Sequence, residues 1–185
     1  MQRDLVALAR EGDHDAFSSL AASSTHRLYG IARAILGSSE RAEDAVQDAL
    51  VLAWRDIAGL RDLDRFDAWL YRLVIRACYR EAGRARRRAL VELRLLPGDR
   101  EPSVALESAV VERDRIERGF QRLAPDHRAV LVLHHQLGLG LAEVAEILDI
   151  PVGTAKSRLF RALKTIRLAI DADDVDPVAT RGQTA

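Results

Sequence analysis

Cysteine is nearly absent from this sequence. Cys78 is the only one among 185 residues, which excludes a disulfide within the chain and argues against a cysteine-based metal cluster. We therefore predict no bound metal and no cofactor. The simplest interpretation of Cys78 is a small core residue in a protein of the reducing cytoplasm.

Aromatic residues, glycine and proline are also scarce. Aromatics make up 5% of the chain, beside 11 glycines and 5 prolines, so β-sandwich and collagen-like folds fit poorly. Long apolar runs are missing too, because the uncharged stretch AVLVLHHQLGLGLA is too short to span a bilayer. The first four residues already carry charge. We therefore expect neither a secretory signal nor a membrane segment.

The abundant residues are helix formers. Alanine, leucine, arginine and glutamate recur throughout, and 48% hydrophobic residues beside 30% charged ones suit a soluble protein with a real core. The length allows one large domain or two small ones. We predict an all-α fold.

Charge is distributed unevenly behind a formal net charge of +0. Residues 65–88 contain eight arginines against two acids, and residues 151–170 contain five basic residues and no acid. Residues 1–64 carry eleven acids against seven basic residues. Two basic segments can neutralise phosphates, while the acidic segment offers a surface to a basic protein partner.

Apolar spacing and capping residues divide the chain into helices. Gly37 ends the first pattern, and Ser38 or Ser39 can cap the second, with acids in its first turns. The N-terminal half is predicted to form helices over about 15–36, 40–57 and 66–87. Residues 89–112, interrupted by LPGDREPS, are interpreted as a linker that holds two helical domains apart. Pro125 begins a later helix, and the tail 171–185 is predicted to be disordered.

The strongest local pattern is GLAEVAEILDIPVGTAKSRLFRALKTI, which begins at Gly140. It predicts a short helix over 141–148, a turn at Asp149-Ile150-Pro151 and a second helix from about Gly153 to Ile166. The exposed face of the second helix is expected to carry cations without an acid. A major groove accepts one such helix, so the pattern indicates a DNA-reading helix-turn-helix. An ordinary helical hairpin with a solvated basic face is the alternative.

The order of these segments resembles a known family. The stretches DAFSSLAASSTHRLYGIARAILGSSERAEDAVQDALVLAWRD and RFDAWLYRLVIRACYREAGRARRR are similar to region two of extracytoplasmic-function sigma factors, and the segment from Leu123 to Arg167 resembles region four. The resemblance implies region two over 1–88, a linker over 89–112 and region four over 113–170. It also implies a non-catalytic subunit that directs RNA polymerase to promoters.

The resemblance assigns three sets of residues. One set would bind the clamp helices of the largest polymerase subunit: Glu43, Asp44, Gln47, Asp48 and Trp54. A second would contact the minus-ten element and its opened strand: Arg61, Asp62, Arg72, Arg76, Arg80, Arg84, Arg86, Arg87 and Arg88. A third would contact the minus-thirty-five element: Gly153, Thr154, Lys156, Ser157, Arg158, Arg161 and Lys164.

Two positions depart from the family pattern. Members commonly carry asparagine and aspartate where this chain has Arg76 and Arg80, so no minus-ten consensus is transferred. The family further implies three partners, namely core RNA polymerase, promoter DNA and a dedicated anti-sigma factor.

Other functions fit less well. A conventional helix-turn-helix regulator acting without core polymerase is the main alternative, but the first 88 residues show neither a heptad seam nor a sensor-domain pattern. An enzyme is disfavoured because His134 and His135 are adjacent on a helix and diverge, and no phosphate loop or nucleophile elbow is present.

Overall fold

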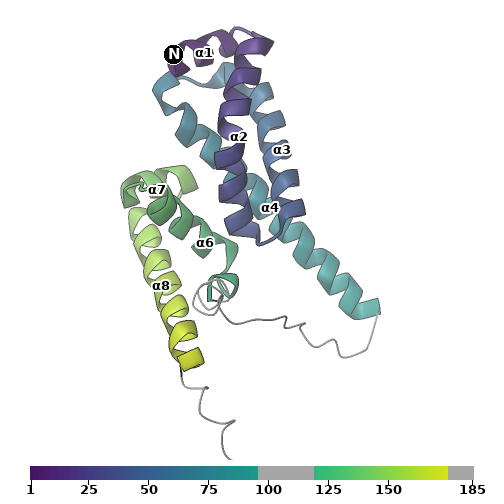
Figure 1. The fold of residues 1–185 in the computed structure, drawn as a ribbon, viewed down its shortest axis with the longest axis vertical. Helices are drawn as coiled ribbons and strands as arrows, with labels where there is room; N and C mark the ends of the chain where they lie inside the picture. The colour runs from purple at the N-terminus through teal and green to yellow at the C-terminus, as the bar shows by residue number, and fades with distance from the viewer. Residues whose placement is uncertain (96–118, 175–185) are drawn as a thin grey trace, which may run out of the picture.

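The computed structural model describes residues 1–95 and 119–174, and within these ranges the chain is helical and has no strand. Figure 1 shows two groups of helices lying side by side. The N-terminal bundle consists of α1 (Gln2–Arg10), α2 (His14–Leu36), α3 (Ser39–Asp56) and α4 (Phe66–Leu95). The C-terminal unit consists of α6 (Pro125–Leu131), α7 (Leu141–Leu148) and α8 (Val152–Asp174). The predicted all-α fold is confirmed.

Capping groups fix the ends of α2 and α3 where the sequence predicts them. Asp13 accepts hydrogen bonds from the backbone of Asp15 and Ala16 before α2, each at 2.9 Å. Gly37 ends α2 with φ of 69°, a left-handed conformation that suits glycine. The Ser38 hydroxyl then accepts from the Arg41 backbone N–H at 3.4 Å and caps α3.

A seam of small residues lets α3 pack closely. Its buried positions include four alanines that recur every three or four residues, so α2 and α4 can approach its backbone from both sides. The seam residues are Ala42, Ala45, Ala49 and Ala53. Side chains that point away from this seam supply the exposed surfaces of α3.

Two helices run further than predicted. Helix α4 continues to Leu95 instead of ending near Arg87, so residues 89–95 of the predicted linker are helical. Helix α8 continues to Asp174, so residues 171–174 of the predicted tail are helical as well. Residues 89–95 are mostly strong helix formers, and neither extension contains glycine or proline. The remainder of the linker, from 96 to 112, and the tail from 175 lie outside the described residues.

Helix α1 was not predicted from the sequence. It is short, but Val6 and Ala9 are buried in the bundle core. The Gln2 amide also donates to the Asp67 carboxylate at 3.2 Å, which joins the start of α1 to the start of α4. Tertiary contacts therefore stabilise a segment that is too short to be a stable helix alone.

The two units pack directly against each other, and the predicted separation by a linker is wrong for this structure. Val130 and Leu133 of the C-terminal unit belong to the same buried core as Leu28 and Ile35 of α2. Helix α6 contacts both α2 and α4, and α7 contacts α4. The reason is physical: the separate core of the C-terminal unit has few members, so much of its apolar surface is buried against the bundle.

Arg128 joins the units through a buried guanidinium. Its side chain donates to the carbonyl of Ile35 at 2.9 Å, at the C-terminal end of α2. It also donates to the carbonyls of Leu123 at 3.1 Å and Gln121 at 2.6 Å. A carbonyl in the last turn of a helix has no partner within the helix, so Arg128 supplies one from the other unit.

Cys78 is fully buried in α4, and burial raises the pKa of its thiol from 9.0 to about 12. Above pH 9 the unfolded chain releases this proton while the folded chain retains it, so stability falls as the pH rises toward 12. At pH 10 we expect a loss of roughly 1 kcal/mol from this group. Urea unfolding at pH 8 and pH 10 measures the loss, and Cys78→Ala should reduce it. An unchanged pH dependence in Cys78→Ala would contradict the assignment.

Candidate nucleic-acid interface

The helix-turn-helix lies where the sequence predicts it. The Glu143 carboxylate accepts from the Gly140 backbone N–H at 2.8 Å and caps α7. Asp149 then takes a left-handed conformation with φ of 58°, which turns the chain out of α7. The Pro151 carbonyl accepts from the N–H groups of Thr154 and Ala155 at 2.9 and 3.1 Å and starts α8. These local contacts fix how α8 is presented to solvent.

Helix α8 has a buried face and a cationic face. Ala155, Ala162 and Ala169 are buried toward α6 and α7. The opposite face exposes most of the residues predicted to read the minus-thirty-five element, and Thr154 is half-buried beside it. The exposed members are Gly153, Lys156, Ser157, Arg161 and Lys164. Because no acid occurs between 151 and 170, this face has a positive field suited to phosphates.

Arg158 lies differently from the prediction. Its side chain is only 24% exposed, and its Nε lies 3.2 Å from Oδ2 of Asp126. Asp126 is in the first turn of α6, so the ion pair turns Arg158 toward the neighbouring helix. We predicted Arg158 on the exposed face because its position on the helix borders that face. Its pairing with Asp126 depends on where α6 packs in three dimensions, which the local sequence does not reveal.

Phe160 is a surface residue that the sequence interpretation missed. It is 69% exposed on α8, although a large aromatic side chain is usually buried. Lys156 and Lys164 lie one turn before and one turn after it. The sequence did contain a signal for this residue, because Phe160 is an apolar side chain among the basic residues of α8.

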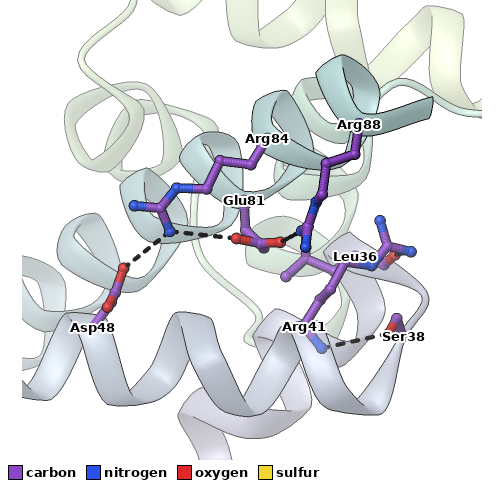
Figure 2. A network of polar contacts seen from close by, with 7 residues as sticks. All are labelled: Leu36, Ser38, Arg41, Asp48, Glu81, Arg84 and Arg88. Carbon is purple, nitrogen blue, oxygen red and sulfur yellow. Dashed lines mark hydrogen bonds and ion pairs between the residues drawn. The ribbon is translucent and has the colours of Figure 1, made fainter. Parts of the chain in front are cut away.

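The predicted minus-ten arginines form a row along α4. Arg72, Arg76, Arg80, Arg84 and Arg88 recur every four residues, so each lies about one turn after the last and the row winds gradually around the helix. In Figure 2 the buried carboxylate of Glu81 lies between Arg84 and Arg88. The Oε1 of Glu81 accepts from Arg88 at 2.6 Å and its Oε2 accepts from Arg84 at 3.4 Å. Glu81 therefore positions the guanidinium groups of Arg84 and Arg88.

The two arginines that depart from the family pattern both have acidic neighbours. Arg76 Nη2 lies 3.7 Å from Oδ2 of Asp149, and Arg80 Nη2 lies 3.9 Å from Oδ2 of Asp48. Both pairs are weakly held at these distances and remain largely solvated. These pairs give Arg76 and Arg80, the two arginines that depart from the family pattern, acidic partners within the chain.

The remaining minus-ten candidates are exposed. Arg86 and Arg87 lie on the solvent side of α4, and Arg61 lies in the loop before it. Asp62 is exposed as well, and its carboxylate accepts from the Asp64 backbone N–H at 3.0 Å and caps the short turn Leu63–Arg65.

The predicted polymerase-binding residues fall on two sides of α3. Glu43, Gln47 and Trp54 line a groove of about 540 Å³ between α2 and α3, together with Phe17 and Leu50. The Trp54 ring packs against Phe17 with centroids 5.0 Å apart, so the floor of the groove is aromatic. This groove presents an apolar anchor with an acid at its edge.

Asp44 and Asp48 face the other way, toward α4. Asp48 Oδ2 lies 3.7 Å from Nη1 of Arg84, as Figure 2 shows, and Asp44 lines a separate pocket with Arg87 and Arg88. Adjacent helical positions diverge by about 100°, so the five predicted residues extend from the α2–α3 groove around α3 to the side that faces α4. Within the described ranges no helix is both long and apolar enough to cross a membrane.

A basic helix-turn-helix beside an arginine-rich helix is typical of a DNA-binding protein. Comparison with protein families agrees: residues 20–88 match the model for Sigma-70 region 2, and residues 113–166 match that for Sigma-70, region 4. The chain is 31% identical over 159 residues to the ECF RNA polymerase sigma factor SigM of Mycobacterium tuberculosis, covering 86% of this chain and 79% of SigM. It is 29% identical over 181 residues to SigW of Bacillus subtilis, covering 90% and 95%.

Solved structures give the same result. The structure of CnrH in complex with the cytosolic domain of CnrY matches with a TM-score of 0.65 and 28% identity, covering 93% of this chain and 98% of CnrH. The Bartonella quintana sigma factor RpoE, solved with the anti-sigma factor NepR, shares the fold with a TM-score of 0.63 and 24% identity, covering 85% of this chain and 98% of RpoE. The chain belongs to the extracytoplasmic-function sigma factors, the alternative factors that direct RNA polymerase in transcription initiation.

Proposed function

We propose that this sigma factor reads the upstream promoter element with the exposed face of α8 and holds the opened minus-ten strand along the arginine row of α4. The observation that carries the first part is the exposed aromatic ring of Phe160, which lies between Lys156 and Lys164 on a face without an acid. Lysine and arginine suit phosphates and guanine edges, and an aromatic side chain suits a thymine methyl group. The chain itself performs no catalysis in this proposal.

The groove between α2 and α3 is proposed to bind the clamp helices of the largest polymerase subunit. Its aromatic floor provides a buried anchor, and Glu43 at its edge can pair with a basic partner. This assignment separates Glu43, Gln47 and Trp54 from Asp44 and Asp48. The latter two are proposed to position the arginines of α4.

An anti-sigma factor is the third proposed partner. A second groove, of about 960 Å³, lies between α2 and the C-terminal unit and includes Tyr29, Phe120 and Leu163. Its lining is mainly apolar, which suits an amphipathic helix of a partner protein. The sigma factor RpoE, which has the same fold, was solved in complex with the anti-sigma factor NepR. We further propose that the protein acts in the cytoplasm, where core polymerase and promoter DNA are present.

Run-off transcription tests the proposed function. Purified core polymerase is given DNA from the upstream region of the gene, with and without this protein, and core binding is measured in the same reactions. A discrete, protein-dependent start site is the expected result. A stable, sequence-specific complex with DNA in the absence of core, together with no core binding, would instead support a conventional helix-turn-helix regulator.

Phe160 provides a sharper test of upstream reading. If its ring contacts a thymine methyl group, replacing that thymine by deoxyuridine removes about 0.8 kcal/mol, or roughly fourfold in holoenzyme affinity. The Phe160→Ala protein should bind more weakly and should no longer distinguish thymine from deoxyuridine at that position. Each thymine of the element is replaced in turn and holoenzyme binding is measured. Equal losses for both proteins at every position would refute the contact, and Phe160→Leu serves as the conservative control.

A further inference from the structure

A carboxylate lies buried beneath the arginine row of α4. Glu81 is one of only two acids between residues 65 and 88, and its side chain is 6% exposed. A buried charge is costly unless it is paired, so this acid requires cations beside it. On a surface that is proposed to bind DNA, an acid also weakens the attraction for phosphates. Its presence there therefore needs an explanation of its own.

Both carboxylate oxygens of Glu81 accept hydrogen bonds from arginines. Arg88 Nη2 donates to Oε1 at 2.6 Å and Arg84 Nη1 donates to Oε2 at 3.4 Å, as Figure 2 shows. Arg84 Nη1 also lies 3.7 Å from Oδ2 of Asp48 on α3. One buried group therefore fixes two guanidinium groups whose side chains remain exposed. Each guanidinium has five N–H donors, so most of them stay available to a ligand.

The same arginines border a pocket of about 500 Å³ between α3 and α4. We call it the Glu81 pocket, and its lining residues are Asp44, Glu81, Arg84, Arg87 and Arg88. Three arginines face two carboxylates, which leaves one positive charge in excess. Arg87 pairs with no carboxylate among the residues that the structure describes. The excess matches the single negative charge of a phosphodiester.

Fixed guanidinium groups bind differently from free ones. A free arginine side chain samples many rotamers and loses that freedom when it binds a phosphate, whereas a side chain that is already held loses less. Arginine also binds phosphate best through two parallel N–H···O contacts, which require a defined orientation. The Glu81 carboxylate therefore lowers the net positive charge of the pocket but supplies this orientation.

We propose that Glu81 is a positioning residue for promoter DNA, and that it holds Arg84 and Arg88 so that the Glu81 pocket binds one backbone phosphate. The inference rests on the proposed function, because it assigns one phosphate to the arginine row of α4. The row continues beyond the pocket through Arg80, which suits a polyanion better than a free phosphate ion. The arginines thereby set a fixed position along the DNA backbone, in addition to general attraction.

A scan of neutral phosphates tests this assignment. Holoenzyme is bound to promoter DNA in which one backbone phosphate at a time is replaced by methylphosphonate, which has no charge. The wild-type protein should lose affinity roughly tenfold at one phosphate of the minus-ten region. With Glu81→Gln the loss at that phosphate should fall to about twofold, because the arginines are no longer oriented. Glutamine retains the size of the side chain and one acceptor oxygen.

A purely electrostatic role for Glu81 predicts the opposite result. If the carboxylate only neutralises its neighbours, its removal frees both arginines, and the loss at that phosphate should grow. Glu11→Gln is the matched control, because it removes the same charge from an exposed position after α1 and should leave the scan unchanged. A larger or an unaltered loss in the Glu81→Gln scan would overturn the positioning role.

A second variant keeps the test decisive if Glu81→Gln does not fold. Arg84→Lys combined with Arg88→Lys leaves the buried carboxylate in place and keeps both charges, but replaces each forked guanidinium by a single ammonium group. Its scan should also flatten at the phosphate that the wild-type protein requires. A wild-type profile in this variant would remove the phosphate from the Glu81 pocket.

Two further measurements separate the remaining outcomes. The free protein is titrated with inorganic phosphate at constant ionic strength, and binding that depends on Glu81 beside a flat DNA scan would assign the pocket to a free anion instead. Run-off transcription then tests the proposed function itself. If wild-type holoenzyme initiates while no phosphate depends on Glu81, only the positioning role is wrong. If it does not initiate, the proposed function fails, whatever the scan reports.

Discussion

Replacement of Arg128 by alanine is expected to lower the free energy of unfolding by about 3 kcal/mol or more. The side chain is only 8% exposed and donates to three backbone carbonyls, of Ile35, Leu123 and Gln121. Truncation leaves buried acceptors without these donors, and each such loss costs roughly 1–3 kcal/mol. Urea unfolding monitored by circular dichroism measures the change.

The control for this prediction is Arg122→Ala, which removes an exposed arginine from the same segment. Its effect should be within about 0.5 kcal/mol. Arg128→Lys retains the charge but not the forked set of donors, so an intermediate loss is expected. Equal stabilities for Arg128→Ala and Arg122→Ala would show that the buried hydrogen bonds contribute nothing net.

Charge reversal at the edge of the α2–α3 groove is expected to prevent capture of core polymerase. Glu43→Arg with Gln47→Arg places two cations beside the aromatic floor formed by Trp54 and Phe17. Like charges facing a basic partner cost several kcal/mol, so affinity should fall by about a hundredfold or more. Co-purification with tagged core polymerase and titration by fluorescence anisotropy measure the loss.

The matched comparison is Asp44→Arg with Asp48→Arg, which adds charge to the other side of the same helix. Asp48 lies within 4.0 Å of Arg80 and Arg84, so this variant is expected to lose stability because cations then repel one another. Its thermal unfolding should therefore shift, whereas that of the groove variant should not. Normal core capture by the groove variant would remove the groove from the proposed interface.

Local chemistry was sufficient to predict much of the helical framework. Gly37 and Ser38 mark the junction of α2 and α3 because a left-handed turn and a hydroxyl cap have clear residue preferences. The turn at Asp149 was equally predictable from the proline that follows it. Where no helix-breaking residue occurs, as in the segment that leads to Leu95, the apolar spacing did not predict where the helix ends.

Tertiary relationships were not predictable in the same way. The side chain of Arg158 is directed by Asp126, which lies on a different helix and far away in the sequence. The division of Glu43 from Asp44 follows from where α2 and α4 lie around α3, not from the residues themselves. The sequence did not predict that the two units pack directly against each other, because an apolar face does not reveal which other surface will cover it.

The alanine seam of α3 has a mechanical consequence. One helix, about 10 Å across, separates the groove that contains Glu43 from the side where Asp48 meets the arginines of α4. With alanines at the contact, there are few long side chains in the seam to absorb a displacement. A displacement of α3 at the groove would therefore be passed to the contact between Asp48 and Arg84. On the proposed assignment, α3 would couple the polymerase-binding groove to the arginines of α4.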